Sequence, residues 1–177
     1  MNELTVVGVR VELPSNQPIV LLREVDGDRY LPIWIGAVEA TAIAFAQQGI
    51  VPARPMTHDL LKDVLEAVDA RLQAVQITEL RDGIFYADLV FDGGVRVSAR
   101  PSDAIALAIR AEAPIFAADR VIEESAIEFE GEEIDQDRLD EEVAKFRNFL
   151  DEVTPDQFAE EVEETDEPED EEEEEAD

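Results

Sequence analysis

The first third of the chain alternates between apolar and polar side chains, which is the pattern of half-buried β-strands. Between residues 4 and 13, one face of the predicted strand carries Val7, Val9, Val11 and Leu13. A second apolar run starts at Ile19, and Asp26-Gly27 is a strong hairpin signal that leads into a third strand ending near Trp34. The pattern therefore predicts a meander of antiparallel strands.

The period then changes from two to that of a helix. Residues 37–46 predict a buried helix rich in alanine, closed by Gly49 as a C-terminal cap. Residues 57–68 predict a second helix whose apolar side chains have helical spacing, namely Leu60, Leu61, Val64, Leu65 and Val68.

The second half of the domain repeats this order of strands and helix. Residues 72–80, 84–91 and 95–99 predict strands, a mostly apolar helix follows from Ser102, and Pro114 opens a last short strand. The whole pattern favours an α+β fold: an antiparallel or mixed sheet with buried Ala-rich helices. A short similarity between residues 39–44 and 103–106 hints at two similar halves, but it is too short to count as a repeat.

Two corners of the chain share the order Arg-Pro, hydroxyl, acid, helix. They are Arg54-Pro55-Met56-Thr57-His58-Asp59 and Arg100-Pro101-Ser102-Asp103. We expect Thr57 and Ser102 to cap their helices, because hydroxyls accept hydrogen bonds from the free N–H groups there. Each arginine either pairs with the nearby acid or helps to bind an external anion at the helix N-terminus. We expect Arg54, Asp59, Arg100 and Asp103 to share one cleft.

The composition changes near residue 120. Residues 1–120 carry 11 basic and 17 acidic residues, whereas residues 121–177 carry 3 and 28. We therefore predict a domain at 1–125, an acidic amphipathic helical extension at 126–159 and a disordered acidic tail at 160–177. The chain lacks the broad basic face that tight duplex binding requires, so any nucleic acid must be bound through a few arginines in a local site.

Residue counts exclude several kinds of site. The chain has no cysteine and one histidine, His58, which excludes disulfides, thiolate catalysis and multi-histidine metal sites. No signal-like segment opens the chain and no apolar run approaches the roughly 20 residues that span a bilayer. We expect a cytoplasmic protein with no membrane partner.

Four motifs at consistent spacing resemble the bifunctional nuclease (BFN) domain family over about residues 1–125. They are Pro32-Ile33-Trp34-Ile35-Gly36, the Glu39-Ala40 helix, Arg54-Pro55-Met56-Thr57-His58-Asp59-Leu60-Leu61, and Arg100-Pro101-Ser102-Asp103-Ala104-Ile105-Ala106-Leu107-Ala108. The resemblance implies nuclease activity on RNA and DNA, a compact α+β fold and self-association. One position departs from the family pattern, because Ser98 stands where members often carry Asp.

We weigh two functions. The first is a metal-assisted nuclease in which Glu39, Asp59 and Asp103 hold Mg²⁺ or Mn²⁺ through oxygen ligands and act in catalysis together with His58, which moves the proton. Substrate phosphate would be bound by Arg54, Thr57, Arg100 and Ser102.

The second function is a non-catalytic binding or regulatory module. Its Arg-Pro corners would form a structural network or a small-anion pocket, and its acidic C-terminus would bind a protein partner. For either function we expect a homo-oligomer, with a two-fold dimer as the commonest form. The surfaces for association would be the Ala-rich helix at 37–46 and the apolar stripe of residues 137–152.

Overall fold

The computed structural model describes residues 1–12 and 16–128, and these form an α+β fold, as predicted. The expected helical extension and acidic tail lie outside the described residues, apart from residues 126–128. Strands and helices follow the chain in the order β1 (Asn2–Glu12), β2 (Gln17–Glu24), β3 (Arg29–Trp34), α1 (Ala37–Gln47), α2 (Thr57–Ala67), β4 (Leu72–Arg81), β5 (Ile84–Phe91), the 3₁₀ turn η1 (Asp92–Gly94), β6 (Arg96–Ala99), α3 (Pro101–Ala111), β7 (Ile115–Ala117), α4 (Asp119–Ser125) and β8 (Ile127–Glu128).

The described strands form one mixed sheet in the order β6-β5-β4-β7-β1-β2-β3-β8. Its neighbouring strands are antiparallel except β4 and β7, which are parallel. The short strand after Pro114 was predicted, but its place in the middle of the sheet was not. There β7 joins the β1–β3 meander to the β4–β6 meander, so a three-residue strand connects the two halves.

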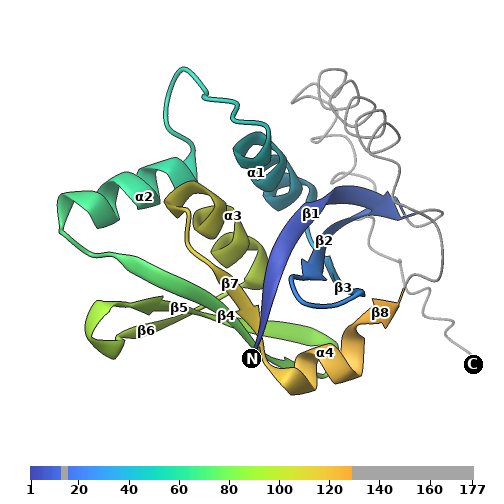
Figure 1. The fold of residues 1–177 in the computed structure, drawn as a ribbon. Helices are drawn as coiled ribbons and strands as arrows, with labels where there is room; N and C mark the ends of the chain where they lie inside the picture. The colour runs from blue at the N-terminus through green and yellow to red at the C-terminus, as the bar shows by residue number, and fades with distance from the viewer. Residues whose placement is uncertain (13–15, 129–177) are drawn as a thin grey trace, which may run out of the picture. The chain divides into compact units, whose positions relative to one another are not determined.

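The two halves have the same topology. In each, a three-stranded antiparallel meander leads into an 11-residue helix, α1 in the first half and α3 in the second. The two helices pack against each other, with α1 also on β1 and β2 and α3 on β4 and β5. Figure 1 shows α1, α2 and α3 grouped together, with α4 apart from them below the sheet.

The core lies between α1, α3 and the sheet. Small alanines on both helices are fully buried there, which permits the close approach of the two helices, and larger apolar side chains fill the space around them. The largest fully buried side chains include Leu21, Leu22, Leu31, Ile43, Ile77, Ile105 and Leu107. Ala40, Ala42 and Ala44 of α1 are thus buried inside the domain, whereas Ala37 and Val38 at its start are exposed. Self-association through this helix stays a prediction.

The first strand differs from its prediction. The register between β1 and β2 shifts between Val6 and Gly8, so the alternation of faces is interrupted there. Val9 is buried as expected, but Val11 is exposed and Leu4 is buried instead. A bulge inserts one residue and moves the side chains beyond it to the other face, which strict alternation cannot anticipate.

Helix α2 contains no buried residue, although its apolar side chains have helical spacing. Leu60, Leu61, Val64 and Val68 are all exposed. The loop before it leaves α1 through Gly49, whose φ of 64° is the left-handed conformation expected of a glycine after a helix. Among the helices in the described part of the chain, none has the length and apolar character needed to cross a bilayer.

The contrast between α2 and α3 predicts different responses to the same substitution. Leu107 is fully buried in α3, so Leu107→Ala should lower the free energy of unfolding by about 2–5 kcal/mol. Leu60 is 55% exposed in α2, so Leu60→Ala should change it by less than about 0.5 kcal/mol. Urea denaturation of both variants checks this. Equal losses would show that another surface covers α2.

Candidate functional site

The site is built around the N-terminus of α3. Arg100 is the N-cap residue of this helix and Pro101 is its first residue, so the helix begins one residue earlier than predicted. Proline suits that position because its fixed φ is already helical and the N–H it lacks would be unpaired there. Ser102 is consequently buried within the first turn, and the prediction that it caps the helix is wrong.

The guanidinium of Arg100 binds two carboxylates. Its Nε and Nη2 donate to Oδ2 and Oδ1 of Asp103 at 2.7 and 3.1 Å. Its Nη1 lies 3.0 Å from Oε1 of Glu39. The side chain is nevertheless 67% exposed to solvent. Three of the five guanidinium N–H groups are therefore engaged, and one each on Nη1 and Nη2 remains for an external acceptor.

Glu39 and Asp103 occupy equivalent places in the two halves. Each is the third residue of its helix, in α1 and α3 respectively, where a negative charge also interacts favourably with the helix dipole. The N-cap residue of α1 is Gly36, in the place that Arg100 takes in α3. A Cβ atom at Gly36 would overlap Oε2 of Glu39, so the missing side chain leaves room for this carboxylate.

His58 joins this network from α2. Its Nε2 lies 3.2 Å from Oδ1 of Asp103, and its side chain is only 12% exposed. In the neutral tautomer that donates from Nε2 to the carboxylate, Nδ1 carries the lone pair. Nδ1 makes no hydrogen bond with the residues that the structure describes.

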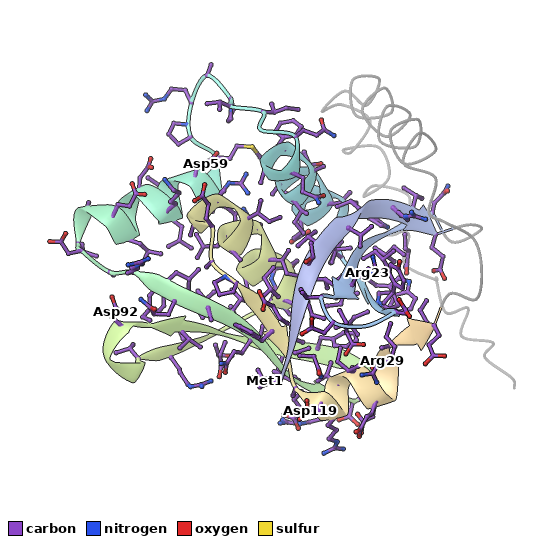
Figure 2. All side chains as sticks on the ribbon, in the orientation of Figure 1. Met1, Arg23, Arg29, Asp59, Asp92 and Asp119 are labelled. Carbon is purple, nitrogen blue, oxygen red and sulfur yellow. The ribbon has the colours of Figure 1, made fainter. Side chains whose placement is uncertain are left out.

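Asp59 lies beside His58 but points to a different partner. One of its oxygens accepts a hydrogen bond from the backbone N–H of Met56 at 2.9 Å, and the other accepts one from Nε of Arg110. Met56 is the N-cap residue of α2, and Thr57 is the first helical residue, so the predicted cap at Thr57 is wrong. The acid at the third position satisfies the N-cap N–H. Figure 2 shows Asp59 where α2 begins, beside α3.

Arg110 is the site residue that sequence reasoning missed. It lies in the last turn of the apolar helix α3, and its side chain is only 8% exposed. Because a buried charge must be paired, a lone arginine on an otherwise apolar helix was the signal available in the sequence.

The predicted cleft is only partly assembled. Arg100, Asp103, Glu39 and His58 are brought together, and we call these four residues the Arg100 network. Arg54 is exposed on the loop before α2 and makes no hydrogen bond or ion pair with the described residues.

The Arg100 network keeps its central acid ionised. Burial raises the pKa of Asp103, but hydrogen bonds from Arg100 and His58 outweigh burial and hold this pKa below its usual 3.8. Burial likewise raises the pKa of Asp59, and hydrogen bonds from Arg110 and the Met56 N–H lower it below 3.8.

These depressed pKa values predict acid sensitivity. A carboxylate whose pKa is lower in the folded state stabilises the fold at pH values above 3.8, and this contribution is lost as pH falls through the folded-state pKa. Asp59→Asn should therefore be less stable than the parent near neutral pH, and the difference should narrow below pH 3.8. Urea denaturation of both proteins between neutral and acid pH measures this difference in the free energy of unfolding. A difference that grows as the pH falls would contradict a lowered pKa of Asp59.

The chain is similar to one known domain family and to proteins from a bacterium and from rice. Residues 20–130 match the bifunctional nuclease domain. A protein of Mycobacterium tuberculosis named "Uncharacterized protein Rv1829" is 50% identical over 161 residues, which cover 89% of this chain and 98% of that protein. "Bifunctional nuclease 1" of Oryza sativa subsp. japonica is 28% identical over 120 residues, covering 64% of this chain and 36% of that protein.

The residues of the Arg100 network all fall inside the matched range. This range includes both helix N-termini, α2 and both meanders except for β1 and the first residues of β2. The match thus covers most of the described chain, and the chain belongs to the bifunctional nuclease domain family.

Proposed function

We propose that this protein is a nuclease that hydrolyses phosphodiester bonds of RNA, DNA or both at the Arg100 network. Membership of the family supports this proposal, as do the names of the rice relatives. The observation that carries it is the exposed guanidinium of Arg100, fixed by two carboxylates and separated from His58 by one of them.

Arg100 supplies the phosphate-binding group. One N–H donor remains on each of Nη1 and Nη2, because Asp103 and Glu39 occupy the other three. Donors on both terminal nitrogens can bind two oxygens of one phosphate in the bidentate manner typical of arginine. Because both carboxylates already fix the side chain, little conformational entropy is lost when phosphate binds.

His58 is the group that moves the proton. The Asp103 carboxylate accepts from Nε2–H, which leaves Nδ1 to take a proton from the attacking water. The water oxygen bonds to phosphorus while the bond from phosphorus to the leaving oxygen breaks, and the leaving oxygen gains a proton from solvent. Asp103 stabilises the imidazolium that forms, and Arg100 stabilises the negative charge on the phosphoryl oxygens.

The charge of the described chain limits how substrate binds. Residues 1–128 carry 11 basic and 20 acidic residues. A long duplex therefore meets no broad electrostatic attraction, and recognition rests on one or a few phosphates near Arg100. Arg54 is exposed and makes no hydrogen bond or ion pair with the described residues. Its guanidinium therefore suits the binding of a second phosphate, as expected from the sequence.

A metal held jointly by Glu39, Asp59 and Asp103 does not fit these side chains. Among residues 1–12 and 16–128, no group of three or more acidic or histidine side chains converges as metal ligands do. Asp59 is bound to Arg110, and the oxygens of Asp103 are bound by Arg100 and His58. Assistance by Mg²⁺ or Mn²⁺ stays a prediction, and no step above depends on it.

Removing the guanidinium should abolish activity without unfolding the protein. Arg100→Ala should lower cleavage of labelled single-stranded RNA and DNA oligonucleotides by at least about 10²-fold, as loss of a charge-stabilising donor does. The free energy of unfolding should fall by less than about 1 kcal/mol, because the ion pairs of Arg100 are largely exposed.

Arg96→Ala is the matched control. Arg96 lies on β6 just before this corner and pairs with Gln76 and Asp88, outside the Arg100 network. Its variant should cleave at the parent rate. Equal activity of the parent and Arg100→Ala, in preparations freed of contaminating nucleases, would reject the proposal.

A second function is supported by the composition of the Arg100 network, in which two carboxylates pair with one guanidinium. Two carboxylates and one guanidinium suit an internal structural pairing or a small-anion pocket in a non-catalytic regulatory module. In a purely structural network, Arg100→Ala would cost several kcal/mol and phosphate would not raise the melting temperature. In an anion pocket, phosphate would stabilise the parent but not the variant, with no cleavage by either.

Association with other chains also stays a prediction. One apolar surface in the described chain that suits a homo-oligomer lies on α2 and its C-cap residue, and comprises Leu60, Leu61, Val64 and Val68. The proposed protein partner of the acidic C-terminus concerns residues outside the described chain. Sedimentation velocity of the full chain at tens of micromolar distinguishes a dimer from a monomer.

A further inference from the structure

We infer that Asp59 and Arg110 form a positioning pair, which holds the first turn of α2 so that His58 reaches Asp103. This inference rests on the proposed function for its catalytic consequence, but its structural part stands on the contacts alone. It assigns Asp59 a role different from the metal ligand or catalyst that the sequence suggested.

The need for such a pair follows from the packing of α2. This helix contributes no buried residue to the core, and its apolar side chains are largely exposed. Hydrophobic burial therefore does little to fix its position against α3, its neighbour in the helical layer. Hydrogen bonds and ion pairs at the N-terminus of α2 must therefore fix its position against α3.

Arg110 provides a rigid anchor for those contacts. Its Nη1 donates to the backbone carbonyl of Ala42 in α1 at 3.0 Å and to that of Ala106 in α3 at 2.9 Å. Its Nε donates to Asp59 at the start of α2. One buried guanidinium thus connects three helices, and its planar geometry fixes the directions of all three contacts.

Asp59 connects Arg110 to the turn of α2 that carries His58. One carboxylate oxygen binds Arg110 and the other binds the N–H of Met56, so the carboxylate locks the N-cap of α2 to α3. The adjacent residue, His58, contacts Asp103, which lies on α3 together with Arg110. Asp103 and Arg110 are seven residues apart, which is about 10 Å along a helix axis.

Two attachment points along α3 fix both the position and the rotation of the first turn of α2. With only the His58–Asp103 contact, the helix could pivot about that bond. With Asp59 held by Arg110 as well, the imidazole has one orientation against Asp103. The contribution of Asp59 and Arg110 to catalysis is therefore the placement of His58.

Kinetics of two variants test this assignment. Asp59→Asn retains a group that can accept from the Met56 N–H but loses the charge that Arg110 binds. Arg110→Lys retains the positive charge but loses the planar guanidinium whose N–H groups bind α1, α2 and α3. Each should lower kcat for a labelled single-stranded RNA oligonucleotide by about 10-fold to 10²-fold, because small displacements of a reacting group have such effects. KM should stay within about twofold, since Arg100 is untouched.

The matched control is Lys62→Gln, which removes a surface ion pair within α2. Lys62 binds Glu66 at 2.7 Å, one turn away on the same helix, and the pair is not part of the contacts that join α2 to α3. This variant should keep the parent kcat and KM. If Asp59 instead bound a catalytic metal, Asp59→Asn would raise the Mg²⁺ concentration required for half-maximal activity; on our assignment that concentration does not change.

A second readout is independent of activity. His58 is the single histidine of the chain, so its ring gives one assignable set of NMR signals. In folded Asp59→Asn and Arg110→Lys, these signals should shift and lose their nuclear Overhauser contacts to α3, while Lys62→Gln should match the parent. Unchanged ring signals and contacts in both variants would overturn the inference, whether or not the parent cleaves nucleic acid. An inactive parent with displaced ring signals would reject only the proposed function.

Discussion

The ion pairs of Arg100 are the interaction on which the candidate site depends. Its guanidinium joins the first turns of α1 and α3, because Glu39 and Asp103 are the third residues of these two helices. The helices themselves can approach closely enough for this only because small alanines fill their interface. A packing requirement in the core thus places two carboxylates and one exposed cation at the same surface.

The repeated topology explains why this arrangement is asymmetric. Both helices follow a three-stranded meander and carry an acid at the third position, but their N-cap residues differ. Arg100 supplies the cation from one half, and Gly36 leaves space for Glu39 in the other. One half therefore contributes the guanidinium, while the other contributes a carboxylate that pairs with it.

Local signals in the sequence predicted the helices and strands up to β7 and one corner of the site, but not α4 or β8. Alternation and turn residues predicted both meanders, and Arg100 and Asp103 are three residues apart at a helix start, so their pairing could be expected. The bulge in β1 and the insertion of β7 between the halves could not, because both depend on long-range strand pairing. The partner of Asp59 depends on the packing of α2 against α3, which no periodicity reports.

The central claim is that a substrate phosphate binds the two remaining N–H donors of Arg100, within reach of His58. A crystal structure with a dinucleotide phosphorothioate that resists cleavage tests this most directly. The account predicts phosphate oxygens within hydrogen-bond distance of Nη1 and Nη2 of Arg100, with Asp103 and Glu39 still holding the guanidinium. A phosphate bound away from Arg100, with the Arg100 network unchanged, would contradict it.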